Sequence, residues 1–319
     1  MTQRRSKLIP LVCLLLMSFL AAAQVTPKPS FRVVPLGVYG GIDESNLSAY
    51  MIAPVGSNNY ISMDAGTLNA GIKKAVANKA FTVSAEKVLR QYIKGYFISH
   101  AHLDHLAGMI INSPEDTTKN VFGLKSTLET IKTHYLTWES WANFADEGNA
   151  PMLKKYHYKP LEPGTETVIE NTDMQVQVFP LSHSNLTSTA FLIRSKGDYI
   201  LYLGDTGPDE VEKSHNMYNL WQAVAPLVRA KKLKAIMIEV SFPNEQPDKT
   251  LFGHLTPKWL MAEMGVLNEF AGSLKGLNIV VTHLKPPMVS ILKIKEQLKA
   301  NNPYGLNLIY PQQGKVLKF

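Results

Sequence analysis

The sequence feature that most constrains this chain is the run His-Ala-His-Leu-Asp-His at residues 100–105, which holds three imidazoles and one carboxylate. It follows an apolar run at residues 96–98 that is typical of a buried strand. Alternate side chains of an extended chain point the same way, so His100 and His102 can bind one cation where the strand ends. Asp104 and His105 come after the turn and face a different direction. This arrangement suits two neighbouring cations better than one, and imidazole with carboxylate, without thiolate, is the ligand set of a hydrolytic zinc site.

Further potential ligands follow three other strand-like runs. These are His183 after residues 176–179, Asp205 after residues 199–203, and His283 after residues 279–282. In α/β proteins, sites form where the carboxyl ends of strands converge, so we expect four strands to bring ligands to one sheet edge. The alternative is a histidine-rich surface loop that binds metal adventitiously, and it leaves the three later residues unexplained.

At these residues the chain resembles the metallo-β-lactamase superfamily, whose mark is H-x-H-x-D-H followed by a downstream His, a bridging Asp and a last His. More narrowly, residues 100–114 look like the signature of class II cyclic-nucleotide phosphodiesterases. Residues 253–257 and 47–52 also look like that family. The resemblance covers the chain from about Arg32 to its end.

The resemblance implies a site that holds two Zn²⁺ ions, with other divalent metals as alternatives. It implies that His100, His102 and His183 bind the first ion, that Asp104, His105 and His283 bind the second, and that Asp205 bridges them. Two zinc ions with two carboxylates carry a formal charge of about +2, and a bound hydroxide reduces this to about +1, which suits a singly charged phosphodiester. His183 has an alternative reading as part of an ordinary loop, because a serine lies on each side of it.

A second pair of candidates is Glu239, which ends an apolar run, and His254. Alone, the glutamate could instead pair with a buried cation or a helix end, and the histidine could be a surface or capping residue. With Thr256, the pair resembles the Glu and His-x-Thr elements that phosphodiesterases of this superfamily, including the tRNA 3′-processing endonucleases, place beside the leaving oxygen. Phosphodiester cleavage needs an acid for the departing alkoxide. We therefore predict catalytic roles for His254, Glu239 and the metal ligand Asp104.

Asp64 and an aromatic cluster each leave two readings open. Asp64 could orient a metal-binding histidine or cap a turn. Residues 126–145 read as a helix carrying Trp138, Trp141 and Phe144, which we expect to be core or a packed flap, with a base-stacking platform as the alternative. His134, His157 and His215 lie outside every motif, and we assign them no role.

Residues 1–23 have the layout of a signal peptide that is cleaved after Ala23. Arg4, Arg5 and Lys7 precede an apolar run at residues 8–20 that small residues close. A retained membrane anchor is the alternative, but the run is shorter than the ~20 residues needed to span a bilayer and contains Pro10. The paired arginines leave Sec and Tat export both open. The only cysteine, Cys13, lies in this segment, so a thiol-free mature protein would suit an oxidising compartment. We expect a secreted, periplasmic protein that is not bound to the membrane.

The charge of the chain favours small anions over nucleic acid. The formal net charge is +7, and removal of the three basic residues of the signal peptide leaves +4. The remaining lysines are scattered among acids, so nucleic-acid binding is not expected. A mild positive field favours small phosphate anions.

Residues 24–319 read as one catalytic domain, because no linker, repeat or low-complexity tract divides them. Strands are predicted at residues 31–36, 49–54, 60–63, 96–98, within 168–203, at 234–240 and at 277–282, and helices at 73–80, 85–93, 126–145, 217–230, 257–274 and 287–299. This order predicts an α/β fold (α+β by some schemes) with a mixed sheet and helices outside. The resemblance implies the four-layer αββα sandwich of the metallo-β-lactamases.

These observations together predict a secreted dizinc phosphodiesterase that hydrolyses 3′,5′-cyclic nucleotides, cAMP or cGMP, to 5′-mononucleotides by a metal-bound hydroxide. The expected partner is thus a small-molecule cyclic nucleotide. The sequence does not distinguish a monomer from a homodimer. One alternative is another hydrolase of the same fold, such as a lactonase, a thioesterase or an RNA phosphodiesterase. The other is a non-catalytic nucleotide- or zinc-binding protein, which would usually lack one of the ligands, whereas none is missing here.

Overall fold

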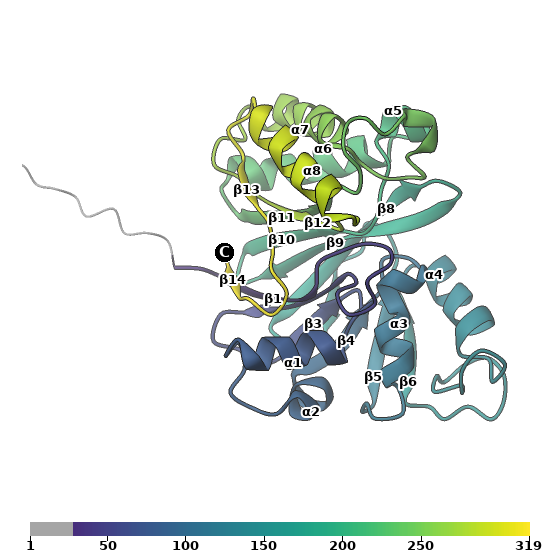
Figure 1. Ribbon diagram of the computed structural model, residues 1–319. Coiled ribbons are helices and arrows are strands. Elements are labelled where there is room, and N and C mark those ends of the chain that lie inside the picture. Colours follow the sequence, from purple (N-terminus) through teal and green to yellow (C-terminus); the bar gives the residue numbers. More distant parts are fainter. Residues whose placement is uncertain (1–27) are drawn as a thin grey trace, which may run out of the picture.

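Two mixed β-sheets face each other in this computed structural model, which describes residues 28–319, and helices cover the outer face of each sheet (Figure 1). The predicted signal peptide lies outside the described residues. The α/β sandwich expected from the sequence is confirmed.

The first sheet has seven strands in the order β14-β1-β2-β3-β4-β5-β6. Their bounds are Phe31–Gly37 (β1), Ala49–Pro54 (β2), Tyr60–Met63 (β3), Ile93–Phe97 (β4), Lys119–Gly123 (β5), Tyr156–Pro160 (β6) and Leu317–Lys318 (β14). Strands β3 to β6 run parallel to one another, and β14, β1, β2 and β3 pair antiparallel. The carboxyl end of β4 therefore lies at the same edge as those of its parallel neighbours.

The second sheet also has seven strands, in the order β13-β12-β11-β10-β9-β8-β7. Their bounds are Thr167–Ile169 (β7), Met174–His183 (β8), Leu186–Ser195 (β9), Asp198–Leu203 (β10), Leu233–Glu239 (β11), Asn278–Thr282 (β12) and Asn307–Ile309 (β13). Strands β10 to β13 are parallel. Because β8 and β10 are both antiparallel to β9, they share a direction, and β8, β10, β11 and β12 all end at one edge.

The helices of each half of the chain cover the sheet of the same half (Figure 1). Those of the first half are α1 (Asn69–Ala77), α2 (Ala85–Lys87), the π-helical turn η1 (Val88–Tyr92), α3 (Leu103–Asn112), α4 (Lys125–Thr130) and the π-helical turn η2 (Ile131–Tyr135). Those of the second half are α5 (Asp209–Glu212), α6 (Asn216–Arg229), the 3₁₀ turn η3 (Asp248–Thr250), α7 (Pro257–Ala271) and α8 (Met288–Ala300).

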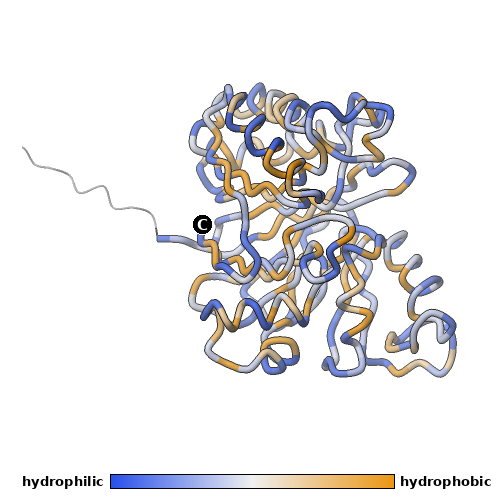
Figure 2. Tube along the Cα trace, viewed as in Figure 1, coloured by the Kyte–Doolittle hydropathy of each residue, from blue (hydrophilic) through white to orange (hydrophobic). Residues whose placement is uncertain are grey.

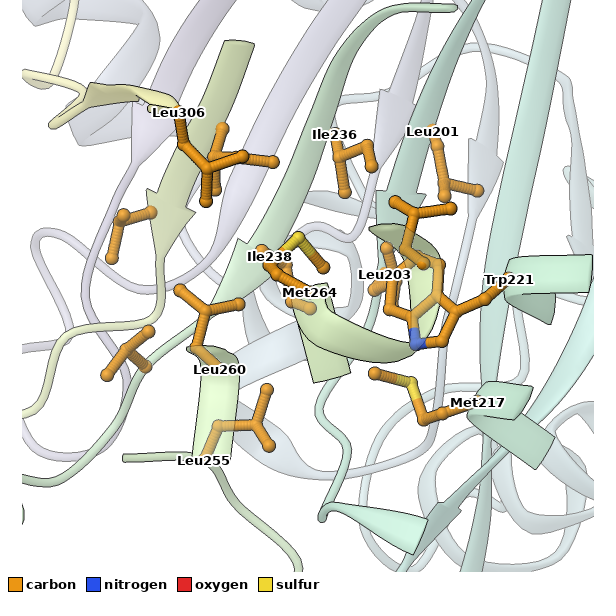
Figure 3. Packing of buried hydrophobic residues seen from close by; sticks show 14 of the residues in the cluster. Leu201, Leu203, Met217, Trp221, Ile236, Ile238, Leu255, Leu260, Met264 and Leu306 are labelled. Atoms are coloured by element: carbon orange, nitrogen blue, oxygen red, sulfur yellow. The ribbon is translucent and has the colours of Figure 1, made fainter. Parts of the chain in front are cut away.

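Three apolar clusters hold these four layers together. One lies between the sheets and includes Phe97, Phe191 and Tyr202, all buried. A second fills the space between the first sheet and its helices. The third joins the second sheet to α6, α7 and α8, where Trp221 and Leu260 pack against strand residues (Figure 3). In Figure 2 the central strands are accordingly more hydrophobic than the outer turns. Burial of these side chains, at about 25 cal/mol per Å² of apolar surface, is the main force that fixes the strands on which the site is built.

Five of the six predicted helices correspond to observed helical segments with shifted bounds, and one does not. The helix predicted at residues 257–274 ends at Ala271, because Gly272 adopts a left-handed φ of +79° that ends the helix. The helix predicted at residues 73–80 lies at Asn69–Ala77 instead. The prediction of one helix over residues 126–145 is wrong. Helical structure ends at Tyr135, since the following segment contains Trp138 at φ +70°, a conformation that a helix cannot contain.

The aromatic residues expected on that helix therefore lie in an irregular loop. Trp141 donates to the hydroxyl of Ser113 at 3.1 Å, and with Phe144 it packs on the outer cluster of the first sheet. Trp138 is 43% exposed and donates to the carbonyl of Pro151. Trp141 and Phe144 thus fit the expectation of a packed flap.

The expectation that four strands meet at one sheet edge needs correction. Strand β4 belongs to the first sheet, while β8, β10 and β12 belong to the second. The ligands therefore meet where corresponding edges of two sheets come together. Within residues 28–319, no helix has the length and apolar composition needed to cross a bilayer.

Candidate metal and catalytic site

The predicted ligands come together at the facing edges of the two sheets. His100 and His102 follow β4, and Asp104 and His105 lie in the first turn of α3. The second sheet supplies the others: His183 is the last residue of β8, Asp205 follows β10, and His283 follows β12. All except His102 and Asp104 are nearly inaccessible to solvent.

Two glycines allow the backbone to approach these imidazoles. A Cβ atom on Gly40 would lie 2.1 Å from Cε1 of His283. Gly253 has a φ of +78°, and a Cβ there would lie 2.6 Å from Nδ1 of His183. Larger residues at either position would displace a predicted ligand.

The first group of ligands is formed by three imidazole nitrogens that face one another. Nδ1 of His102 lies 3.0 Å from Nε2 of His100 and 3.2 Å from Nε2 of His183. Nδ1 of His183 is 2.7 Å from the carbonyl of Gly253, to which it donates, so Nε2 of this ring carries a lone pair. Three such nitrogens fit around a cation that binds through imidazole.

The second group contains Asp104, His105 and His283. Oδ2 of Asp104 lies 3.1 Å from Nε2 of His283 and 3.9 Å from Nε2 of His105. Nε2 of His105 is buried and has no hydrogen-bond partner among the described residues. A buried nitrogen without a partner is costly, and a metal ion would satisfy it. The amide of Gly41 donates to Oδ2 of Asp104 at 2.9 Å and holds this carboxylate in place.

Asp205 lies between the two groups. Its Oδ2 atom is 3.2 Å from Nε2 of both His105 and His283, which belong to the second group. The same oxygen is 3.8 Å from Nε2 of His100 and 4.0 Å from Nε2 of His183, which belong to the first. One carboxylate can therefore reach both groups, and the donor set fits the pair of divalent cations expected from the sequence.

The electrostatics of the site favour bound cations. Burial lowers the pKa of His100, His102 and His183, in His183 to about 4, so these rings are neutral near pH 7, as metal binding requires. Burial raises the pKa of Asp205, but the charges of His283 and His105 outweigh it and hold that pKa well below its usual range.

The pKa of His105 shifts the other way. Burial lowers it, but the charges of Asp205, Asp64 and Asp104 outweigh burial and raise the pKa of His105 well above its usual value. These carboxylates therefore stabilise positive charge at this place in the protein.

Asp64 orients His105 through a network of hydrogen bonds. Its Oδ2 accepts from Nδ1 of His105 at 2.7 Å, from the hydroxyl of Tyr202 at 2.6 Å and from the hydroxyl of Ser99 at 2.8 Å. Its Oδ1 accepts from the amide of Ser99 at 2.7 Å. Of the two readings of Asp64, the contacts favour the one in which the carboxylate fixes the ring of a metal-binding histidine.

Glu239 and His254 form the second predicted unit. Nδ1 of His254 donates to Oε1 of Glu239 at 2.8 Å, and both side chains are buried. Glu239 also accepts from the amide of Thr206 and from the hydroxyl of Ser241. Burial raises the pKa of Glu239, but the charge of His254 outweighs it and lowers that pKa. Nδ1 of His254 is 3.8 Å from Oδ2 of Asp205, so the pair adjoins the proposed metal ligands.

Sequence reasoning missed Lys285. Its ammonium donates to Nε2 of His254 at 2.8 Å, on the side of the ring opposite Glu239. No spacing in the sequence links Lys285 to His254, because the two meet only through the fold. The unassigned histidines stay outside the site: His157 pairs with Asp146, His215 precedes α6, and His134 is exposed.

The chain is similar to known proteins over nearly its whole length. The family "cAMP phosphodiesterases class-II" matches residues 31–314. The 3′,5′-cyclic-nucleotide phosphodiesterase of Aliivibrio fischeri is 44% identical over 324 residues, which covers 96% of this chain and 97% of that protein.

Solved structures share the fold. Unliganded yeast PDE1 matches with a TM-score of 0.81 at 22% identity, covering 91% of this chain and 100% of that one. YhfI from Bacillus subtilis, a metallo-β-lactamase fold protein, matches with a TM-score of 0.62 at 16% identity, covering 91% and 99%.

The network around Asp64 predicts the effect of Asp64→Asn. An amide cannot accept the same hydrogen bonds, so His105 should lose its orientation and the affinity for Zn²⁺ should fall about 10- to 100-fold. Competition titration with a chelator measures this affinity. Asp173→Asn, at an exposed position, should leave it unchanged. Equal affinities in wild type and Asp64→Asn would show that Asp64 does not support a ligand.

Proposed function

The chain belongs to the class-II cAMP phosphodiesterases, which are hydrolases, and on that premise we propose that it hydrolyses cAMP or cGMP to the 5′-mononucleotide with the aid of two zinc ions. We propose the ligand assignment made from the sequence, in which three histidines bind one ion, Asp104, His105 and His283 bind the other, and Asp205 bridges.

The observation that carries this proposal is the position of Asp205. Its Oδ2 atom lies within 4.0 Å of imidazole nitrogens from both groups of ligands. A site for a single ion would not need one carboxylate oxygen to face both groups. Two ions, when bound, would supply a hydroxide at neutral pH and neutralise charge on the phosphoryl oxygens.

The residues of the chain would orient the reaction. Asp64 holds His105, and the amide of Gly41 holds Asp104, so these ligands are fixed before substrate arrives. A fixed arrangement requires little reorganisation when charge develops on the phosphoryl group.

His254 would act beside the 3′ leaving oxygen. The carboxylate of Glu239 fixes the ring by accepting a hydrogen bond from Nδ1, and Nε2 is the ring atom that Lys285 contacts. In this role Nε2 of His254 would carry a proton in place of the hydrogen bond from Lys285 and donate it to the departing alkoxide, which is a poor leaving group without one.

Other hydrolytic functions of this fold are distinguished by substrate. A lactonase or thioesterase would act on carboxylic esters. An RNA phosphodiesterase would need a basic surface for a polyanion, which the scattered lysines do not suggest. A protein that only binds nucleotide or zinc would bind without turnover.

The direct test is to assay purified protein against cAMP, cGMP, linear phosphodiesters, a lactone and a thioester, with zinc measured by elemental analysis. We expect turnover of cyclic nucleotides to 5′-mononucleotides with two zinc ions per chain, and loss of turnover after a strong chelator removes them. Full activity with one metal ion would contradict the two-ion assignment. Turnover of only the carboxylic esters would contradict the substrate class.

The role of His254 predicts a substrate-dependent defect. His254→Ala should lower kcat for cAMP about 10²- to 10⁴-fold while zinc content stays unchanged. The deficit should shrink with bis(p-nitrophenyl) phosphate, whose phenolate leaves without a proton. His134→Ala, at an exposed histidine, is the control. Equal losses on both substrates would exclude a proton-donor role and indicate a role in binding or structure.

We also propose that the protein is exported to the periplasm, on the basis of the basic and apolar segments at residues 1–23. Expression of the full chain in a Gram-negative host should give a periplasmic protein whose intact mass corresponds to a start at Gln24. A full-length product in the cytoplasm would contradict this.

A further inference from the structure

We propose that Lys285 is a substrate-binding residue whose ammonium contacts a non-bridging oxygen of the phosphoryl group. This inference rests on the proposed function, because it names the group that holds the charged part of that substrate. Lys285 has no assigned role in the sequence motifs, and its position becomes evident only from the three-dimensional arrangement.

The position of Lys285 is set by strand β12. The residue lies two positions after His283, which follows the end of this strand. Its ammonium lies 2.8 Å from Nε2 of His254 and 5.1 Å from the centroid of the Phe242 ring. The imidazole and the aromatic face thus hold a half-buried cation in one place.

The hydrogen-bonding capacity of Lys285 is only partly used. An ammonium has three N–H donors and no acceptor. Nε2 of His254 accepts one of them, since Nδ1 of that ring donates to Glu239. Across residues 28–319, no lysine–carboxylate pair within 4.0 Å includes the Lys285 ammonium. Two donors and an uncompensated positive charge are therefore available to an anion.

Three other partly or fully buried lysines pair with a carboxylate. Lys119 pairs with Asp116, Lys132 with Glu129, and Lys234 with Asp198. A carboxylate offsets part of the cost of removing each of these charges from water. Half-buried Lys155 has two backbone carbonyls as acceptors instead. Lys285 instead has the imidazole of His254 as its side-chain partner, and no carboxylate within 4.0 Å among the described residues.

The ammonium also lies close enough to the proposed metal ligands to share one phosphoryl group with them. His254, which it contacts, has a ring centroid 4.8 Å from that of His183 and 5.4 Å from that of His283. One imidazole thus separates Lys285 from ligands of both proposed ions. A phosphoryl group beside those ligands can direct one oxygen toward Lys285, and lysine is a common point-charge binder of phosphate.

A purely positioning role is the competing explanation. In that case Lys285 only holds Nε2 of His254, and its loss would affect proton donation without affecting the affinity for phosphate. Three substitutions separate the two roles. Lys285→Arg keeps the charge, Lys285→Gln keeps a hydrogen-bond donor for His254 without charge, and Lys285→Met removes both.

The test is calorimetric titration of the zinc-loaded protein with inorganic phosphate and with 5′-AMP. Lys285→Met and Lys285→Gln should each weaken binding of both ligands about 10- to 100-fold, because a charged hydrogen bond is lost. Lys285→Arg should stay within about threefold of wild type. The control is Lys293→Met, which removes an exposed lysine of α8 that pairs with Glu245. Its phosphate affinity should not change.

Zinc content and the circular dichroism spectrum establish that each variant is folded and loaded. Unchanged phosphate affinity in Lys285→Gln, or equal losses in Lys285→Gln and Lys285→Arg, would overturn the proposal. Binding of phosphate requires no turnover, so this result is independent of the proposed reaction. Wild-type protein that binds phosphate through Lys285 but does not hydrolyse cyclic nucleotides would contradict the proposed function alone.

Discussion

The structure around the site depends on the burial of several imidazoles and carboxylates whose ligand atoms face one another. Three nitrogens of His100, His102 and His183 converge with lone pairs that cannot all be satisfied by hydrogen bonds among themselves. Nε2 of His105 is buried and has no hydrogen-bond partner within residues 28–319. Such an arrangement is unfavourable for the protein alone, and divalent cations would make it favourable. The proposed function therefore depends on metal ions that the carboxylate of Asp205 would bridge.

The fold positions these groups by ending strands of the same direction at facing edges of two sheets. The three apolar clusters fix the strands in place. The predicted ligands lie at or just after the ends of β4, β8, β10 and β12. Hydrogen bonds from outside the ligand set then orient the rings: Asp64 holds His105, and the carbonyl of Gly253 holds His183. This second set of contacts comes from distant parts of the chain, since Asp64 also joins Tyr202 of the second sheet to Ser99 of the first half.

Much of this could be predicted from the sequence, because strand ends and histidine spacing are local signals. The fold class, most of the strands and the family followed from these signals, whereas β5, β6, β13 and β14 were not predicted. The ligand roles of the seven metal-site residues remain predictions that the geometry supports. Contacts between distant residues could not be predicted. Lys285 meets His254 only in the folded chain, and the alternative readings of Asp64 differ only in contacts that the fold creates. The helix expected at residues 126–145 failed for a different reason: helix-compatible composition does not reveal that Trp138 takes a left-handed conformation.

The central claim is that the carboxylate of Asp205 bridges two metal ions. A crystal structure of the zinc-loaded protein, with anomalous difference maps calculated from data on both sides of the zinc absorption edge, tests it most directly. The account predicts two zinc peaks about 3.5–4 Å apart, each about 2.0–2.2 Å from an oxygen of Asp205. One peak alone, or two peaks with Asp205 bound to only one of them, would contradict it.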